Sequence, residues 1–181
     1  MKGKYVVADE NFDPASLPKD RPTIGMPRTM HFHQLGLFWV HLFYELGYMP
    51  VISPDTDGKI VNDGIAAMTC ETCFPIKLSH GHTIHLKDKT DYLFIPMLIE
   101  MPPNPNGRRG FYCPYQQGNY HMLKAALDLK EEKCIHPAIH LQDGREGMED
   151  AFRAEFERLG LSLNAFTKAW NTAREELTTF Q

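Results

Sequence analysis

The stretch "TIGMPRTMHFHQLGLFWVHLFYELGYMPVISP", residues 23–54, predicts a strand, a helix and a second strand. It begins with a short apolar run that stops at a proline, and it ends with a similar run. Between them, apolar residues recur at helical spacing and Gly47 is placed to end the helix: Leu35, Phe38, Leu42, Phe43 and Leu46. A strand, a helix and another strand form the basic unit of a parallel sheet.

The rest of the chain continues this alternation. The continuous apolar run "DYLFIPMLI" predicts a strand at 91–99 that is buried on both faces. We also expect a strand over 134–141, interrupted by Pro137. The expected helices cover 55–68, 75–87, 113–129, a stretch from Gly144 to Gly160, and 162–180. The sequence therefore predicts an α/β fold with a mainly parallel sheet of about four strands and helices on both faces.

These elements suggest three segments. Residues 1–22 are polar and contain prolines, so we expect an extended lead-in. Residues 23–145 hold the alternating strands and helices of the α/β domain. Residues 146–181 are expected to form C-terminal helices, because two amphipathic stripes follow one another there without a further strand.

Composition excludes several classes of function. The net charge of −4 gives no broad attraction to nucleic acid or to an anionic membrane. No run of about 18 apolar residues predicts a membrane span, and the first residues lack a signal-peptide core. Four cysteines in 181 residues are too few for a disulfide scaffold. We therefore expect a cytoplasmic protein whose cysteines are thiols or metal ligands.

Two of the cysteines precede helices. Cys73 lies just before the helix that Pro75 is placed to begin, and Cys113 is followed directly by a proline and a helix. A helix N-terminus stabilises a thiolate, which is the form that binds metal. Crossover helices of a parallel sheet start at its carboxyl edge, where ligands gather. We therefore expect both sulfurs at one edge, in a metal or cluster site.

Cys70 leaves other interpretations open. With Cys73 it forms a C-x2-C pair, which occurs in zinc sites, iron–sulfur sites and redox motifs. A zinc site would combine Cys70 and Cys73 with one histidine of the next helix: His80, His82 or His85. A third hypothesis is a protein-interaction module in which the cysteines are inert.

The remaining candidates are single residues. His31 and His33 flank the start of the first helix, near the expected site edge. A lone histidine more often caps a helix or is satisfied in the core than binds a ligand. Cys134 begins a predicted strand and is expected to be a small buried hydrophobe.

Five motifs in order resemble one family: "IGMPRTMHFHQLGLFWVHLFYELGY", "VISP", "ETCFPIKLSHGH", "DYLFIPML" and "YCPYQQGNY". The chain is similar over about residues 23–130 to the CoA-enzyme-activase-associated domain of unknown function. That domain resembles the subunits of 2-hydroxyacyl-CoA dehydratases and double-cubane cluster proteins. The resemblance implies a Rossmann-like three-layer fold that is paired with a second α/β domain. It also implies an ATP-dependent iron–sulfur activator module as a partner that delivers low-potential electrons. A CoA thioester is then a candidate substrate.

The resemblance also implies a site. An iron–sulfur cluster, 4Fe-4S or double-cubane, would be held by Cys73, Cys113 and a third cysteine in the next domain, with Arg28, Lys77 and His80 nearby. Cys70 is an extra cysteine relative to the family pattern. We expect the isolated chain to be a fragment, largely free of the cluster and inactive alone. Zinc is the alternative metal.

Overall fold

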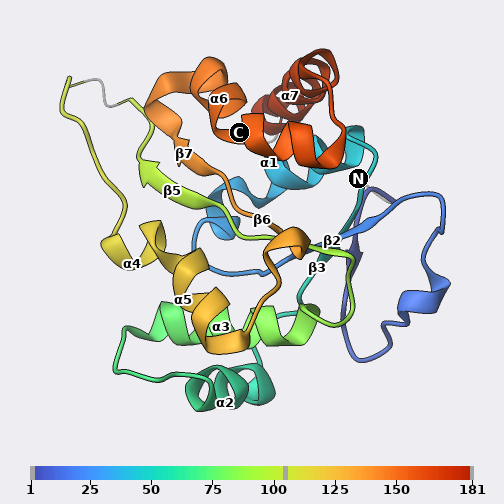
Figure 1. Ribbon diagram of the computed structural model, residues 1–181, viewed down its shortest axis with the longest axis vertical. Helices are drawn as coiled ribbons and strands as arrows, with labels where there is room; N and C mark the ends of the chain where they lie inside the picture. Colours follow the sequence, from blue (N-terminus) through green and yellow to red (C-terminus); the bar gives the residue numbers. More distant parts are fainter. Residues whose placement is uncertain (1–2, 104–105, 180–181) are drawn as a thin grey trace.

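The computed structural model describes residues 3–103 and 106–179, and it has the α/β architecture that the sequence predicts (Figure 1). Its main sheet is parallel and has the order β1-β3-β2-β4-β6. The strands are β1 (Val6–Val7), β2 (Thr23–Met26), β3 (Met49–Ile52), β4 (Tyr92–Phe94) and β6 (Cys134–Ile135). After β2 the chain adds β3 on one side of that strand and then β4 on its other side. The carboxyl end of β2 therefore lies at the topological switch point, where such folds bind ligands.

Two predicted strands are each divided by a proline. The segment 91–99 splits into β4 and β5 (Met97–Glu100) around Pro96, and the segment 134–141 splits into β6 and β7 (Ala138–His140) around Pro137. The pairing nevertheless continues past the prolines, because Ile95 N donates to Ile135 O at 2.9 Å and Met97 N donates to Pro137 O at 2.9 Å. Proline has no N–H to donate, so the ladder is interrupted where it occurs. β5 and β7 form a separate parallel pair.

Helices cover both faces of the sheet (Figure 1). On one face lie α1 (Phe32–Glu45), α6 (Gly144–Leu159) and α7 (Leu163–Thr179); on the other lie α3 (Phe74–Leu86) and α5 (Asn119–Leu127), with α2 (Gly58–Ala66) outside α3. The first core joins α1, the sheet and both C-terminal helices, through residues such as Trp39, Phe43, Phe94, Phe152 and Phe166. The helices expected after residue 145 are thus part of this three-layer packing.

Glycines let α2 lie directly against α3. A Cβ atom at Gly64 would overlap the carbonyl oxygen of Lys77, and one at Gly81 would overlap the carbonyl oxygen of Ile60. Both obstructing atoms belong to the backbone of the facing helix. The two helices therefore approach more closely than larger residues at these two positions would allow.

The structure departs from the predicted elements at three further places. The expected lead-in adds an edge strand, since β1 pairs with β3, and so the main sheet has five strands among the described residues where we expected about four. The helix expected over 113–129 is divided at Gly118 into α4 (Pro114–Gln117) and α5. Short 3-10 turns occupy Pro14–Ser16, Glu131–Lys133 and Leu141–Asp143. Residues 1–2 and 180–181, the extreme ends of the expected segments, lie outside the described residues.

Among the helices of the described residues, none is long and apolar enough to cross a membrane.

Candidate functional site

Cys73 and Cys113 line one hollow of about 400 Å³. Cys73 occupies the N-cap position of α3, and Cys113 occupies that of α4. Both cysteines are exposed. Figure 1 shows the start of α3 below α4, on the same side of the molecule. We call this hollow the cysteine pocket; its lining is Met30, His31, Gln34, Cys73, Pro75, Ile76, Tyr112, Cys113, Tyr115 and Gln116.

Proline fixes the backbone at both cysteines. Each helix has a proline in its first turn, where a missing N–H costs no hydrogen bond. The carbonyl oxygen of Cys73 accepts from Ile76 N at 3.1 Å, and that of Cys113 accepts from Gln116 N at 2.9 Å. Neither thiol caps its own helix through a side-chain hydrogen bond. Both sulfur atoms therefore remain available to a ligand.

Two nitrogen atoms of the cysteine pocket are enclosed without a hydrogen-bond partner among the described residues: His31 Nδ1 and Gln116 Nε2. Burial lowers the pKa of His31 to about 4, with repulsion from His33 as the smaller cause, so the ring is neutral at pH 7. Buried polar atoms nearly always have partners, and exceptions call for an explanation such as a missing ligand. Two thiols with two unpaired nitrogens suit a sulfur-rich metal group, because sulfur binds metal and also accepts hydrogen bonds.

Arg28 and Lys77 lie at the same edge but do not line the cysteine pocket. Arg28 follows β2; its backbone N–H donates to Ser53 Oγ at 2.8 Å and its guanidinium pairs with Asp55 at 2.6 Å. Lys77 is on the first turn of α3 and pairs with Glu71 at 3.1 Å. Both cations are thus held by exposed carboxylates at the rim of the site.

A buried polar chain supports the loop that contains Arg28. His82 is fully buried, and its Nδ1 and Nε2 atoms lie 2.8 Å from Ser53 Oγ and 3.0 Å from Thr56 Oγ1. Burial is the main cause that lowers the pKa of His82 to about 4. The neutral ring therefore links α3 to the loop after β3, which indicates a structural role for this histidine.

Cys70 and His80 do not line the cysteine pocket. Both line a second hollow of about 500 Å³ between the start of the α3 segment and α5, which also contains His121. His80 Nδ1 donates to Ile76 O at 2.9 Å, which leaves Nε2 as the acceptor atom of the neutral ring. Burial also lowers the pKa of His80. The two cysteines of the C-x2-C pair therefore line different hollows.

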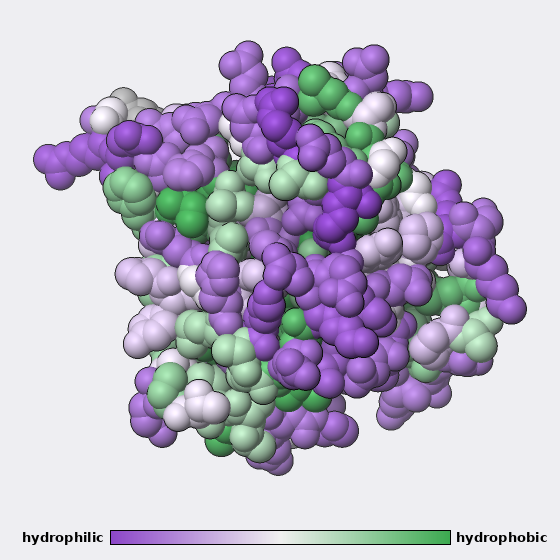
Figure 2. All heavy atoms as spheres, in the orientation of Figure 1, coloured by the Kyte–Doolittle hydropathy of each residue, from purple (hydrophilic) through white to green (hydrophobic). Residues whose placement is uncertain are grey.

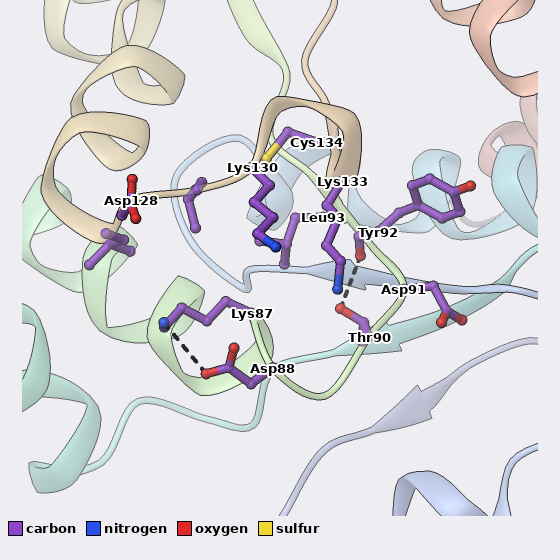
Figure 3. Close-up of a pocket in the computed structure, with 12 residues that line it drawn as sticks. Lys87, Asp88, Thr90, Asp91, Tyr92, Leu93, Asp128, Lys130, Lys133 and Cys134 are labelled. Atoms are coloured by element: carbon purple, nitrogen blue, oxygen red, sulfur yellow. Dashed lines mark hydrogen bonds and ion pairs between the residues drawn. The ribbon is translucent and has the colours of Figure 1, made fainter.

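Cys134 lies at the opposite edge of the sheet. It begins β6 and lines a hollow of about 340 Å³ beside the amino ends of β4 and β6. Figure 3 shows it next to Lys130 and Lys133 on the segment that leads into the strand. Burial raises the pKa of the Cys134 thiol to about 11. As expected, it is a small buried residue.

Among the described residues, one group of three His, Cys, Asp or Glu side chains has ligand atoms all within 4.8 Å of one another: Glu100, His140 and Asp143. The Glu100 carboxylate is almost fully buried, and it pairs with Arg109 at 2.6 Å and His140 at 2.9 Å. Both of its oxygens therefore already have partners. Arg109 lies on the segment before Cys113, so this buried carboxylate holds that segment against β5.

Reasoning from the sequence overlooked Gln116. The signal was present, because residues three apart on a helix share a face and Gln116 follows Cys113 by three. For His31 the sequence favours a capping or core role. It takes the N-cap position of α1 without making a capping bond.

Comparison with known proteins identifies the family of the chain. No curated protein and no solved structure matches the chain. The model of one family, described as the CoA enzyme activase uncharacterised domain, matches residues 23–181. The match covers β2 and every later element, including α6 and α7 beyond the motifs that first suggested it. The chain therefore belongs to the family of CoA enzyme activase uncharacterised domains.

Proposed function

We propose that this domain holds an iron–sulfur cluster through Cys73 and Cys113 and serves ATP-driven, low-potential electron transfer in a CoA-enzyme-activase system. The observation that carries the proposal is the cysteine pocket, where two exposed thiols meet two unpaired nitrogen atoms. The membership of the chain in its family supports the choice of chemistry. When bound, a cluster of this kind supplies one-electron reduction.

The two thiolates do not complete a cluster's coordination, since such clusters typically take four protein ligands. The surface around the cysteines suggests where the others come from. Large apolar side chains are exposed beside both: Phe74 (53%), Met101, Phe111 (57%) and Tyr115. Figure 2 shows hydrophobic side chains gathered on the left of the molecule, where β5 ends and the chain leads to α4. Exposed apolar patches of this kind mark interaction surfaces.

We assign that surface to a second α/β domain, which would supply the missing ligands and exclude water from the cluster. An ATP-dependent iron–sulfur activator module is the proposed electron donor, and a CoA thioester is the proposed class of acceptor. In this scheme Cys73 and Cys113 fix the cluster to the sheet edge. Arg28 and Lys77 lie at the rim, where an anionic partner or substrate would displace the exposed carboxylates of Asp55 and Glu71 that now pair with them.

Anaerobic reconstitution tests the proposal. The chain is supplied with iron, sulfide and a small thiol that fills the outstanding coordination sites, and iron and sulfide are then counted per chain. We expect equal amounts of both, and loss of most of the iron in Cys73→Ser and in Cys113→Ser. Cys70→Ser is the matched control, because Cys70 is equally exposed but lines the other hollow. Unchanged iron in both serine variants of the cysteine pocket would refute the assignment.

Zinc remains the second candidate because Cys70, His80 and His121 line one hollow, although Cys73, the other cysteine of the expected zinc site, lines the cysteine pocket. The acceptor atom of His80 is set by its bond to Ile76 O, an arrangement common in metal-binding histidines. Elemental analysis of protein purified in air separates the two candidates. One zinc per chain that is lost in Cys70→Ser, but kept in Cys113→Ser, would favour this alternative.

A further inference from the structure

We infer that His31 and Gln116 donate N–H hydrogen bonds to sulfur atoms of the group that Cys73 and Cys113 hold, and thereby set its retention and reduction potential. The inference rests on the proposed function and adds to it two positioning residues from outside the cysteine pair. It starts from the two unpaired nitrogen atoms in the wall of the cysteine pocket.

Neither His31 Nδ1 nor Gln116 Nε2 has a hydrogen-bond partner in the part of the chain that the structure describes, although the backbone around both residues is fixed. Met30 adopts a left-handed backbone conformation with φ of 49°, which a residue with a side chain rarely does, and the next residue is His31 at the start of α1. Strain of this kind tends to be kept at functional sites. On α4, the side-chain Nε2 of Gln117 donates to Tyr112 O at 2.7 Å, whereas the side-chain Nε2 of its neighbour Gln116 has no acceptor among the described residues.

The surroundings favour sulfur as the acceptor. Much of the rest of the cysteine pocket is apolar or aromatic, with Met30, Pro75 and Ile76 among its lining residues. Thiolate and sulfide sulfur atoms accept hydrogen bonds, and such bonds tune the potential of iron–sulfur groups. A neutral imidazole can place its hydrogen on Nδ1 when an acceptor lies there.

Hydrogen-bond donation to sulfur accounts for the unpaired nitrogen atoms of both His31 and Gln116. An amide nitrogen such as Gln116 Nε2 is a donor without an acceptor lone pair, so it does not bind iron. His31 Nδ1 is enclosed in the same pocket and likewise has no partner within residues 3–103 and 106–179. A hydrogen bond to sulfur stabilises negative charge on the group. Its loss should therefore make reduction harder and release of the group easier.

The test uses the reconstituted chain and its variants His31→Phe and Gln116→Met, which keep bulk and remove the donor. We expect each to bind the cluster about 10- to 100-fold less tightly, as when outer-shell partners of metal ligands are removed. We also expect a more negative reduction potential by electrochemical titration. His31→Asn, which can place an amide N–H near the Nδ1 position, should restore both properties. His33→Phe is the control, because His33 is exposed and does not line the pocket.

A purely structural role gives a different result. Removing an unpaired buried nitrogen should leave the cluster-free chain at least as stable as the original, so a large loss of its thermal stability in His31→Phe would overturn the inference. Unchanged retention and potential in both donor variants would also overturn it, while the iron counts of the cysteine variants still decide the proposed function separately. Rescue by His31→Cys but not by His31→Asn would make His31 an iron ligand and refute donation.

Discussion

Replacing Gly81 by alanine should loosen the contact between α2 and α3. The new Cβ atom would overlap the carbonyl oxygen and carbon of Ile60, which belong to the backbone of α2 and cannot rotate away. Relief therefore requires α2 to move off α3, or α3 to shift against the sheet. Gly81 lies between two buried histidines of α3, so either movement also disturbs the network around His82.

The expected magnitude is the difference of two effects. Overpacking typically costs about 1–3 kcal/mol, and a rigid backbone obstruction places this case at the upper end. Alanine in a helix interior recovers about 1 kcal/mol relative to glycine. The net loss should therefore be about 2 kcal/mol in the free energy of unfolding. For a chain of this length that corresponds to a fall of about 4–8 °C in the midpoint of thermal unfolding.

Urea denaturation and calorimetry of the purified chain measure this loss. Gly58→Ala is the matched control, because Gly58 begins α2 and a Cβ atom there would have nothing within 4 Å. The control gains helix propensity without a clash, so it should be unchanged or more stable by up to about 1 kcal/mol. If Gly81→Ala were as stable as its control, the close approach of the two helices at this glycine would be refuted.

Three further outcomes are expected. Asp57→Ala should lose about 1 kcal/mol by urea denaturation, because the Asp57 side chain accepts from Ile60 N at 2.8 Å and caps α2; an unchanged midpoint would contradict the cap. At pH 8 iodoacetamide should label Cys134 far more slowly than the three exposed cysteines, since burial raises the pKa of its thiol to about 11. Peptide mass spectrometry measures the labelling of each cysteine, and equal rates would contradict the prediction. Folding lowers the pKa of His82 from 6.5 to about 4, so as the pH falls the unfolded chain binds a proton at this residue before the folded chain does. The contribution of neutral His82 to the free energy of unfolding should therefore be complete above pH 6.5 and fall as the pH drops toward 4. An equally steep loss of stability in acid for His82→Gln would contradict this prediction.

The sequence was most informative where one pattern extends over many residues. The helix and two strands of 23–54 follow from apolar spacing, and α1 begins and ends close to the predicted limits. Short elements behave differently. β1 has only two residues, and its position depends on pairing with β3 rather than on any local pattern. Pro96 lies inside a run so uniformly apolar that it predicts one strand, although the missing N–H divides it into two.

At the candidate site, too, some features follow from the local sequence and others depend on how distant segments pack. The two cysteines that meet in the cysteine pocket share a local feature, a helix whose first turn contains a proline, and the edge rule for parallel sheets then brings them together. Cys70 has the more familiar spacing, but no helix starts at it. The hollow that Cys70 lines depends on how the segment between α2 and α3 turns, and the C-x2-C spacing does not specify that turn. For these cysteines, a common position at helix starts is therefore a better guide than sequence spacing to which of them line one hollow.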